Sequence, residues 1–278
     1  MKSIMSFNPG KRFPAISITG SDCRLNCPHC SGRPLASMLC ADTPDRLLAI
    51  ASHLEDSGAL GFLLSGGCDS TGALPVGPFL RAITAIKTST NLKINAHVGY
   101  PRAEEAKGLV SSGIDAFSLN FPINDDVGLR IMRIPNAVQR YFETRDSLER
   151  EGASRIVPHV LIGLAHIDEE IDGLRVLQQD PPDGLVVIVF NPLPKTPMRA
   201  APPPDEVHVV EFLSRCKEIL PETTIVLGCM RKRGNHRLEK YLIEQLLDGI
   251  VMPCKRATEE CQGSVKFEER EGCCALYL

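Results

Sequence analysis

Three cysteines stand close together near the amino terminus, in the segment Cys23-Arg-Leu-Asn-Cys27-Pro-His-Cys30. Their C-x3-C-x2-C spacing places three thiols on one short loop. Three thiolates can hold three irons of a cubane 4Fe–4S cluster and leave the fourth iron without a protein ligand. Because a small molecule can chelate an open iron and be activated there, the loop predicts a reactive iron–sulfur site. Cys23, Cys27 and Cys30 are its expected metal ligands and catalytic centre.

Zinc and inert buried thiols are the alternatives to a cluster. A zinc site would need a fourth ligand, such as Cys40 or His29, but structural zinc sites usually carry paired C-x2-C knuckles. Free cysteine is often buried without any chemical role. Cys40 and Cys216 are expected to be ordinary cysteines of this kind, not cluster ligands. The chain has 11 cysteines, and this odd number without an export signal favours metal ligation over disulfides.

The composition is that of an ordinary globular chain. Of its 278 residues, 43% are hydrophobic and 23% charged, which argues against disorder. A net charge of −3 gives no basic field for nucleic acid or an anionic membrane. The longest apolar run, Leu185 to Phe190, is far shorter than a membrane span, and no apolar signal segment precedes Pro9. We expect a soluble cytoplasmic protein with neither nucleic acid nor membrane as partner.

Short β-type runs alternate with helical patterns along the whole chain. The eight predicted strands are Ala15–Thr19, Gly61–Ser65, Leu92–Ala96, Ala116–Asn120, Ile156–Ile162, Leu185–Phe190, Thr224–Leu227 and Gly249–Met252. Strands that alternate with crossover helices predict an α/β fold, a parallel (β/α) barrel of the TIM type, complete or partial. The barrel is expected over residues 1–252. Residues 253–278 fit the pattern less well and are expected to form a C-terminal extension that caps it.

In such a barrel, reactive groups lie where strands end and loops begin. The second predicted strand ends in Ser65-Gly66-Gly67-Cys68, and glycine is needed where backbone must approach a ligand closely. Paired glycines are also common in ordinary turns. Polar residues that can point into the barrel mouth, or merely satisfy loop backbone, are Asn95, His97, Ser118, Asn120 and Arg231.

The cysteine loop, in this place, resembles that of the radical S-adenosylmethionine (SAM) superfamily. The resemblance implies that the free iron binds SAM and that an electron from the cluster cleaves it to a 5′-deoxyadenosyl radical, which abstracts hydrogen from unreactive carbon. His29 stands where the superfamily usually has Tyr or Phe. Further segments that resemble SAM-contacting segments are Ser65-Gly66-Gly67, His159-Val-Leu-Ile162-Gly163 and Asn191-Pro192-Leu-Pro-Lys195-Thr196-Pro, with His159 and Lys195 each in place of a family glycine.

The resemblance extends over nearly the whole chain. Its further segments are Phe13-Pro-Ala-Ile-Ser-Ile-Thr-Gly20, Leu64-Ser-Gly-Gly-Cys68, Gly228-Cys-Met-Arg231 and Glu271-Gly-Cys273-Cys274-Ala-Leu276. They are similar to the two-component lipoyl synthases of archaea and some bacteria, relatives of biotin synthase. This subgroup implies sulfur insertion into an octanoyl chain held on a carrier, either a lipoyl domain or a glycine cleavage H-type protein. It also implies a second radical SAM subunit and a low-potential electron donor such as ferredoxin or flavodoxin.

Sulfur insertion needs a sulfur donor within reach of a carbon radical, and a second, auxiliary iron–sulfur cluster can provide it. Strand-tip cysteines and an adjacent pair near the carboxyl end are the candidate ligands: Cys68, Cys229, Cys273 and Cys274. Cys254 and Cys261, together with the terminal pair, form an alternative site lying wholly in the last residues. Two other functions stay open. One is a single-cluster radical SAM methyltransferase or mutase of cofactor biosynthesis, and the other is a non-enzymatic iron–sulfur or zinc protein.

Overall fold

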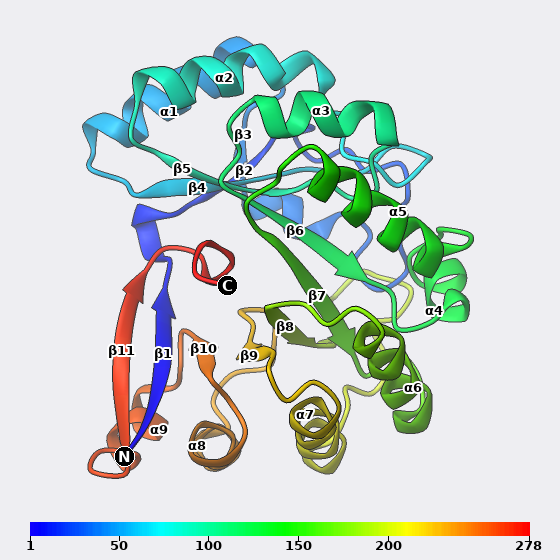
Figure 1. The fold of residues 1–278 in the computed structure, drawn as a ribbon, viewed down its shortest axis with the longest axis vertical. Helices are drawn as coiled ribbons and strands as arrows, with labels where there is room; N and C mark the ends of the chain where they lie inside the picture. Colours follow the sequence, from blue (N-terminus) through cyan, green and yellow to red (C-terminus); the bar gives the residue numbers. More distant parts are fainter.

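The computed structural model describes all residues, 1–278, as one parallel eleven-stranded sheet that curls into an open barrel (Figure 1). The strands follow the order β11-β1-β10-β9-β8-β7-β6-β5-β4-β2-β3, and the edge strands β11 and β3 do not pair with each other. The predicted α/β barrel of the TIM type is thus confirmed in its partial form. No helix in the structure is both long enough and apolar enough to span a bilayer.

Helices and strands alternate along almost the whole chain. The strands are β1 (Lys2–Asn8), β2 (Ala15–Ser17), β3 (Leu39–Cys40), β4 (Gly61–Ser65), β5 (Lys93–His97), β6 (Ala116–Phe121), β7 (Ile156–Ile162), β8 (Gly184–Val189), β9 (Thr224–Leu227), β10 (Gly249–Val251) and β11 (Val265–Glu271). The α-helices are α1 (Pro44–Asp56), α2 (Leu80–Ser89), α3 (Ala103–Ser111), α4 (Asp125–Arg130), α5 (Ala137–Arg150), α6 (Ile167–Gln178), α7 (Glu206–Ile219), α8 (His236–Gln245) and α9 (Lys255–Glu260).

Local sequence explains why these elements form. Helix α1 begins after Thr43, whose side chain accepts a hydrogen bond from the Arg46 amide, and Pro44 occupies the first turn, where its missing N–H costs nothing. Leu47, Ala51 and Leu54 recur at helical spacing and are the buried face of this helix. Strand β8, with the sequence Gly-Leu-Val-Val-Ile-Val, is a nearly continuous β-branched run, as expected for a parallel strand covered on both faces.

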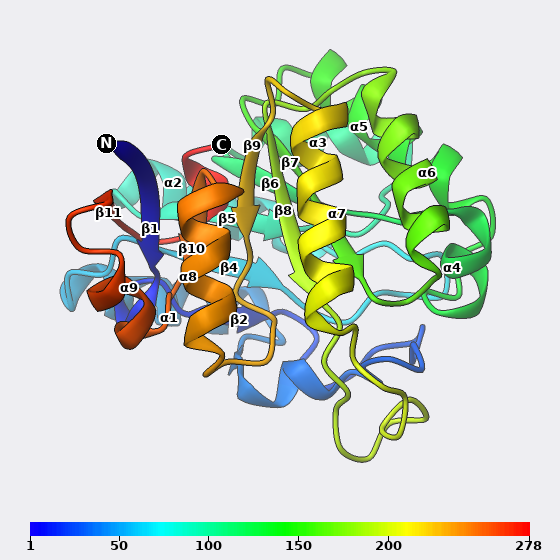
Figure 2. The same cartoon turned by 90° about the horizontal axis from the view of Figure 1, so that it is seen from below.

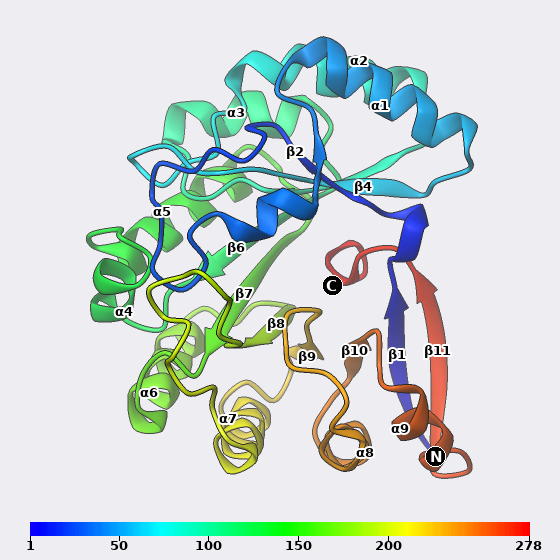
Figure 3. The same ribbon diagram turned by 180° about the vertical axis from the view of Figure 1, so that it is seen from behind.

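The sheet has two separate apolar layers. The larger core packs the outer face of the strands against the surrounding helices (Figure 1). A smaller cluster fills part of the barrel interior, where Phe7, Val186 and Val251 meet Cys274 and Ala275. The carboxyl terminus therefore lies on the concave side of the sheet, as Figures 1 and 3 both show.

The two ends of the chain differ from the expectation. Residues 2–8, not predicted as a strand, form β1, and residues 253–278 do not make a separate cap over the barrel mouth. They continue the βα pattern with α9 and β11, and β11 pairs in parallel with β1 from Lys2↔Val265 to Asn8↔Glu271. The final residues then enter the barrel, where Leu278 lies so close to Gly184, the first residue of β8, that a Cβ there would come within 2.6 Å of it. Further up the barrel, Cys274 and Ala275 pack with Phe7 and Val251, near the carboxyl ends of β1 and β10.

Candidate functional site

The cysteine loop, residues 20–38, follows β2 and packs directly on the turn that follows β4. The Arg24 amide donates to the Cys68 carbonyl at 2.9 Å, and the Gly67 amide donates to Thr19 Oγ1 at 2.7 Å. An added Cβ on Gly67 would lie 2.5 Å from Cys23 Cα and still closer to the Asp22 carbonyl oxygen. Gly67 is thus required because the backbone of the cysteine loop occupies the space of its missing side chain.

Gly66 also has little room for a side chain, but the surrounding atoms are less rigid than those around Gly67. A Cβ there would meet Leu74 Cδ1 at 2.8 Å and Thr19 Oγ1 at 3.1 Å, which are ends of side chains rather than backbone. The double glycine therefore joins the cysteine loop to the sheet, a role that the sequence interpretation, a close approach to SAM, did not include.

The electrostatics of the loop differ from thiol to thiol. A hydrogen bond from the Cys27 thiol, helped by His29, lowers the pKa of Cys30 to about 4, although burial opposes this shift. The same hydrogen bond and burial raise the pKa of Cys27, whose Sγ also lies 3.3 Å from the Met132 carbonyl oxygen. Because the thiolate is the form that binds metal, this lowered pKa favours the ligating form of Cys30.

A cavity of about 240 Å³ opens beside these thiols. Its lining includes all three loop cysteines and the predicted contact residues His29, Ser65, Gly66, Gly67 and Asn120. Cys68 also lines it, and burial together with the neighbouring Cys23 raises the pKa of Cys68 to about 12. The structure thus gathers the three cysteines and the glycine turn around one concave space.

The donor set of this cavity fits an iron–sulfur cluster with a bound small molecule. His29 Nδ1 is buried and has no hydrogen-bond partner, and an unpaired buried donor or acceptor is costly unless a ligand satisfies it. No three His, Cys, Asp or Glu side chains converge closely enough to ligate one metal ion. A zinc site would need four ligands about 2.3 Å or less from a single ion, whereas the thiolates of a cubane each bind a different iron. The arrangement favours the cluster.

Three predicted polar residues lie outside this cavity, in the barrel interior. Ser118 Oγ donates to Asn95 Oδ1 at 3.0 Å, and Asn95 Nδ2 approaches Cys273 Sγ at 3.2 Å. His97 stacks edge-on against His159 with ring centroids 5.1 Å apart, and burial lowers the pKa of His97 to about 3 and that of His159 to about 4. The interior is therefore lined here by polar side chains that carry no charge at neutral pH.

The four cysteines predicted for an auxiliary cluster divide into two groups. Cys229, Cys273 and Cys274 lie close enough together for their charges to interact: burial and then Cys273 raise the pKa of Cys229. A hydrogen bond from Cys274 lowers the pKa of Cys273 to about 7, and the pKa of Cys274 rises correspondingly. Cys68, by contrast, lies with the first loop.

The alternative C-terminal cysteine site is not assembled. Cys261 is buried next to Glu244 and Lys240 of α8, on the helical side of the sheet, and Cys254 precedes α9 with its amide donating to Glu239 Oε2 at 2.6 Å. Neither residue interacts with the Cys273–Cys274 pair, which lies inside the barrel.

The segment 190–205 after β8 forms a strap that reaches the cysteine loop. The Met198 amide donates to the Pro28 carbonyl at 3.3 Å, and Figure 2 shows the two segments, yellow and blue, at the same end of the barrel. A Cβ on Gly163, whose φ is +87°, would come within 2.5 Å of Pro204 Cδ, so the β7–α6 turn supports the strap. The predicted contact residues Ile162, Gly163, Asn191 and Pro192 do not line the cavity; Ile162 is fully buried in the outer core.

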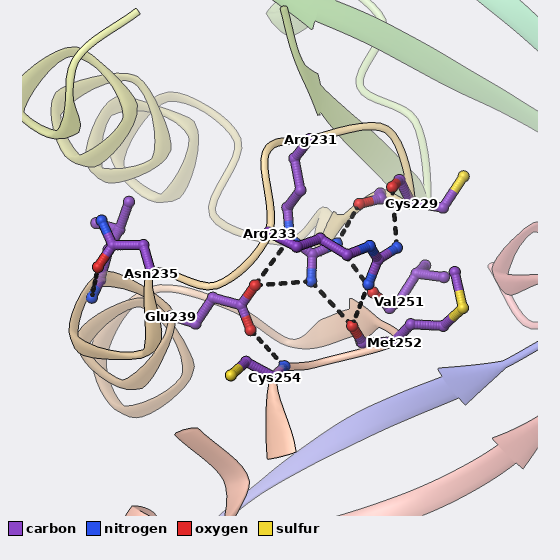
Figure 4. Close-up of polar contacts among 10 residues, drawn as sticks. Cys229, Arg231, Arg233, Asn235, Glu239, Val251, Met252 and Cys254 are labelled. Atoms are coloured by element: carbon purple, nitrogen blue, oxygen red, sulfur yellow. Dashed lines mark hydrogen bonds and ion pairs between the residues drawn. The ribbon is translucent and has the colours of Figure 1, made fainter. Parts of the chain in front are cut away.

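Arg231 proves to be a structural residue. Its guanidinium donates to the carbonyls of Gly228 and Val251 at 2.6 and 2.9 Å and pairs with Glu239 at 3.1 Å, with both side chains buried (Figure 4). Arg233 donates to the Met252 carbonyl at 2.6 Å. These contacts tie the end of β9 to the end of β10, and they leave Arg231 no free donor for a SAM carboxylate.

Several residues of the site carried no signal in the sequence. Tyr100, Met132 and Ile134 line the cavity although they come from loops after β5 and α4. Glu170 is fully buried and accepts the amides of Gly163, Leu164 and Ala165 at 2.7 to 3.3 Å. Glu170 lies in the first turn of α6, where acidic side chains are favourable because the amides there are unpaired.

Two curated relatives by sequence are biotin synthases. The one from Halorhodospira halophila is 21% identical over 84% of this chain and 73% of its own length. The one from Synechococcus sp. is 26% identical over 55% of this chain and 51% of its own length. No protein-family model matches the sequence.

The fold is shared with several solved structures. Methylornithine synthase (PylB) has a TM-score of 0.65 at 15% identity, over 90% of this chain and 72% of its own. The FeFe-hydrogenase maturase HydG from Carboxydothermus hydrogenoformans also has a TM-score of 0.65, at 16% identity. The match covers 90% of this chain and 58% of HydG. Coproporphyrinogen III oxidase (HemN) from Escherichia coli, a radical SAM enzyme, has a TM-score of 0.55 at 12% identity. The match covers 91% of this chain and 64% of HemN.

These findings agree with the site built from the residues. The open parallel barrel is the fold of these structures, and the sequence similarity to biotin synthases extends over most of the chain. The three thiols of Cys23, Cys27 and Cys30 line one cavity with the glycine turn. The chain is thus similar in sequence to biotin synthases and shares the open parallel barrel of these solved structures.

Proposed function

We propose that the protein cleaves SAM reductively and inserts sulfur into an unactivated C–H bond, that of an octanoyl chain bound to a carrier protein. The observation that carries this proposal is the presence of two separate thiol groups. Cys23, Cys27 and Cys30 line the cavity near the mouth, whereas Cys229, exposed in the loop after β9, lies near the Cys273–Cys274 pair, which packs in the barrel interior. One group suffices for radical formation, whereas sulfur insertion needs a second sulfur source.

Each part of the chain has a defined task in this proposal. The three loop thiolates would hold the first cluster, and His29 lines the cavity beside them. When bound, the cluster supplies the electron that cleaves SAM and so the radical that abstracts hydrogen. Thr19 Oγ1 accepts the Gly67 amide and donates to the Asp22 carbonyl at 2.9 Å, which fixes the turn against the loop.

The barrel interior would receive the substrate chain. Asn95 holds Cys273 through its amide, and Ser118 fixes the orientation of Asn95. His97 and His159 stay neutral at physiological pH because burial lowers the pKa of each. An uncharged acyl chain is compatible with such a lining, since no buried charge would lose its hydration. A second radical SAM subunit and the carrier domain are the proposed partners.

The first experiment tests radical chemistry. After anaerobic reconstitution, reduced wild-type protein is expected to form 5′-deoxyadenosine from SAM in the presence of an octanoylated peptide. Cys27→Ala is expected to abolish this activity and to lose about four irons, because two thiolates do not retain a cluster with one open iron. Cys40→Ala is the matched control, since Cys40 is exposed in β3, just after the cysteine loop. Equal SAM cleavage by Cys27→Ala and wild type would exclude the assignment.

The second experiment tests sulfur insertion. About eight irons per chain are expected in wild type, and about four in Cys229→Ala/Cys273→Ala, with 5′-deoxyadenosine formation retained and thiolated product lost. Cys68→Ala is expected to keep the second set of irons because Cys68 lies beside the first loop. Four irons in wild type would instead favour the single-cluster alternative, a methyltransferase or mutase.

A further inference from the structure

We propose that a second cavity, between α3 and α5 on the outside of the barrel, binds a small molecule that carries a phosphate group. This space, here called the α3–α5 cavity, has a volume of about 290 Å³, far more than the roughly 15 Å³ in which a single water molecule fits. Its walls are the start of α3 and one face of α5, two helices that pack side by side (Figure 1). It shares no lining residue with the cavity beside the cysteine loop.

One face of α5 supplies most of the polar groups of the α3–α5 cavity. Arg140, Thr144, Ser147 and Arg150 recur at helical spacing, so they form a row along the helix, and all four line the cavity. Long side chains on a helix lean toward its amino end, and Arg150 Nη2 accordingly lies 3.5 Å from Ser147 Oγ. The row therefore brings two guanidinium groups and two hydroxyls to one wall.

Thr144 is the residue that points to a ligand. Only 3% of its surface is exposed, and its hydroxyl forms no hydrogen bond within the chain. A hydroxyl inside a helix usually donates to a carbonyl one turn back, as Ser147 Oγ does to the Glu143 carbonyl at 2.7 Å. A buried donor without a partner costs free energy unless a bound group accepts its hydrogen. The Thr144 hydroxyl is therefore an open donor in the wall of the cavity.

Arg140 and Arg150 bring positive charge that no carboxylate of the chain neutralises. Neither guanidinium forms an ion pair, although many other arginines do, such as Arg145 with Asp180. Arg140 donates once, to the Tyr100 carbonyl at 3.3 Å, so most of its five N–H groups stay available. Because the guanidinium fork matches the oxygens of phosphate, these two side chains favour an anion of that kind.

The acidic side chains of the α3–α5 cavity already have partners. Glu143 Oε1 accepts from Gln139 Nε2 at 2.7 Å, and Asp146 pairs with Arg145 Nη2 at 3.3 Å. Both carboxylates are exposed, so salt and water screen their repulsion of an anion. With three arginines against these two acids, the lining keeps a net positive charge.

The start of α3 adds backbone donors on the opposite wall. Ala103, the first residue of α3, lines the cavity. Amides in the first turn of a helix have no partner within the helix, and the positive end of the helix dipole favours an anion there. A phosphate monoester offers three acceptor oxygens, whereas a carboxylate offers two. Phosphate therefore meets more of the guanidinium, hydroxyl and amide donors of the cavity.

The direct test measures binding of inorganic phosphate to the reconstituted full chain by calorimetry, with sodium chloride holding the ionic strength constant. Wild type is expected to bind one phosphate per chain. Thr144→Val/Arg150→Gln is expected to weaken binding at least about tenfold, because a hydroxyl and a charged donor are lost. Neither residue touches Tyr100, which lines the cavity beside the cysteine loop. Should the double variant fail to fold, Arg150→Gln alone, at an exposed position, is expected to weaken binding at least about threefold.

Two controls decide where phosphate binds and whether phosphate is the right class. Arg81→Gln/Arg237→Gln removes two exposed cations without ion pairs on α2 and α8 and is expected to bind phosphate like wild type. Acetate is expected to bind wild type at least about tenfold more weakly than phosphate. The proposal is overturned by wild type that binds no phosphate, or by equal phosphate affinity of the cavity and control variants, which would place the ion elsewhere. Acetate binding as tight as that of phosphate also overturns it. None of these outcomes depends on SAM cleavage.

Discussion

Gly67→Ala is expected to uncouple the cysteine loop from the sheet. The new Cβ would lie 2.5 Å from Cys23 Cα and 2.6 Å from Cys23 Cβ, and closer still to the Asp22 carbonyl oxygen. Neither backbone can absorb this overlap by rotating a side chain. The loop that carries Cys23 must therefore move away from the turn, or the turn must move away from β4.

The cost follows from the contacts that the movement would break. Overpacking of a fitted site costs about 1–3 kcal/mol. Displacing the loop also strains the Arg24 amide to Cys68 carbonyl bond and the Gly67 amide to Thr19 bond, each worth about 1 kcal/mol. A loss of about 2–4 kcal/mol in the free energy of unfolding corresponds to a decrease of roughly 4–8 °C in Tm for a chain of this length.

A graded series of alanine variants makes the assay decisive. At Gly66 the nearest atoms are side-chain ends, so a loss of about 1 kcal/mol is expected. Gly77, with nothing within 4 Å of its added Cβ and no positive φ, is the control and is expected to be unaffected. Thermal unfolding gives the Tm, and iron content after reconstitution reports on the loop. The reasoning is refuted if Gly67→Ala melts and binds iron like Gly77→Ala.

Three further outcomes follow from buried polar groups. Burial lowers the pKa of His97 to about 3, so between about pH 6.5 and 3 the unfolded chain binds a proton that the folded chain does not. Stability therefore falls on acidification by up to about 1.4 kcal/mol per pH unit. His97→Asn should remove this part of the slope in urea unfolding at pH 7.0 and 5.5, and an unchanged slope would contradict it. Glu170→Ala leaves three amides and His208 without their acceptor and should cost about 3 kcal/mol or more in urea unfolding, whereas the exposed Glu169→Ala should cost little. Arg231→Met isolates the buried Glu239 carboxylate and should cost about 3–5 kcal/mol; a wild-type midpoint in denaturant would show that the pair is dispensable.

The sequence by itself determined the reactive loop and the fold class. The C-x3-C-x2-C spacing is local, so it fixed three thiols on one loop whatever the rest of the chain did. Alternating β-branched runs and amphipathic helices predicted a parallel barrel, and parallel order places every strand-to-helix loop at one end. That rule alone predicts that Gly66, Gly67 and the cysteine loop lie at the same end of the barrel. In the structure they line one cavity.

Only the tertiary structure decided which distant residues meet. β1 and β11 pair with each other across nearly the whole chain length, and no local pattern encodes such a pairing. The Cys273–Cys274 pair lies inside the barrel because β11 is its edge strand, so the expected cap over the mouth did not form. Likewise Arg231 looked like a ligand in the sequence, yet buried carbonyls and Glu239 occupy all its donors. Spacing along the chain determines local chemistry, whereas burial and partner choice depend on contacts between segments far apart in sequence.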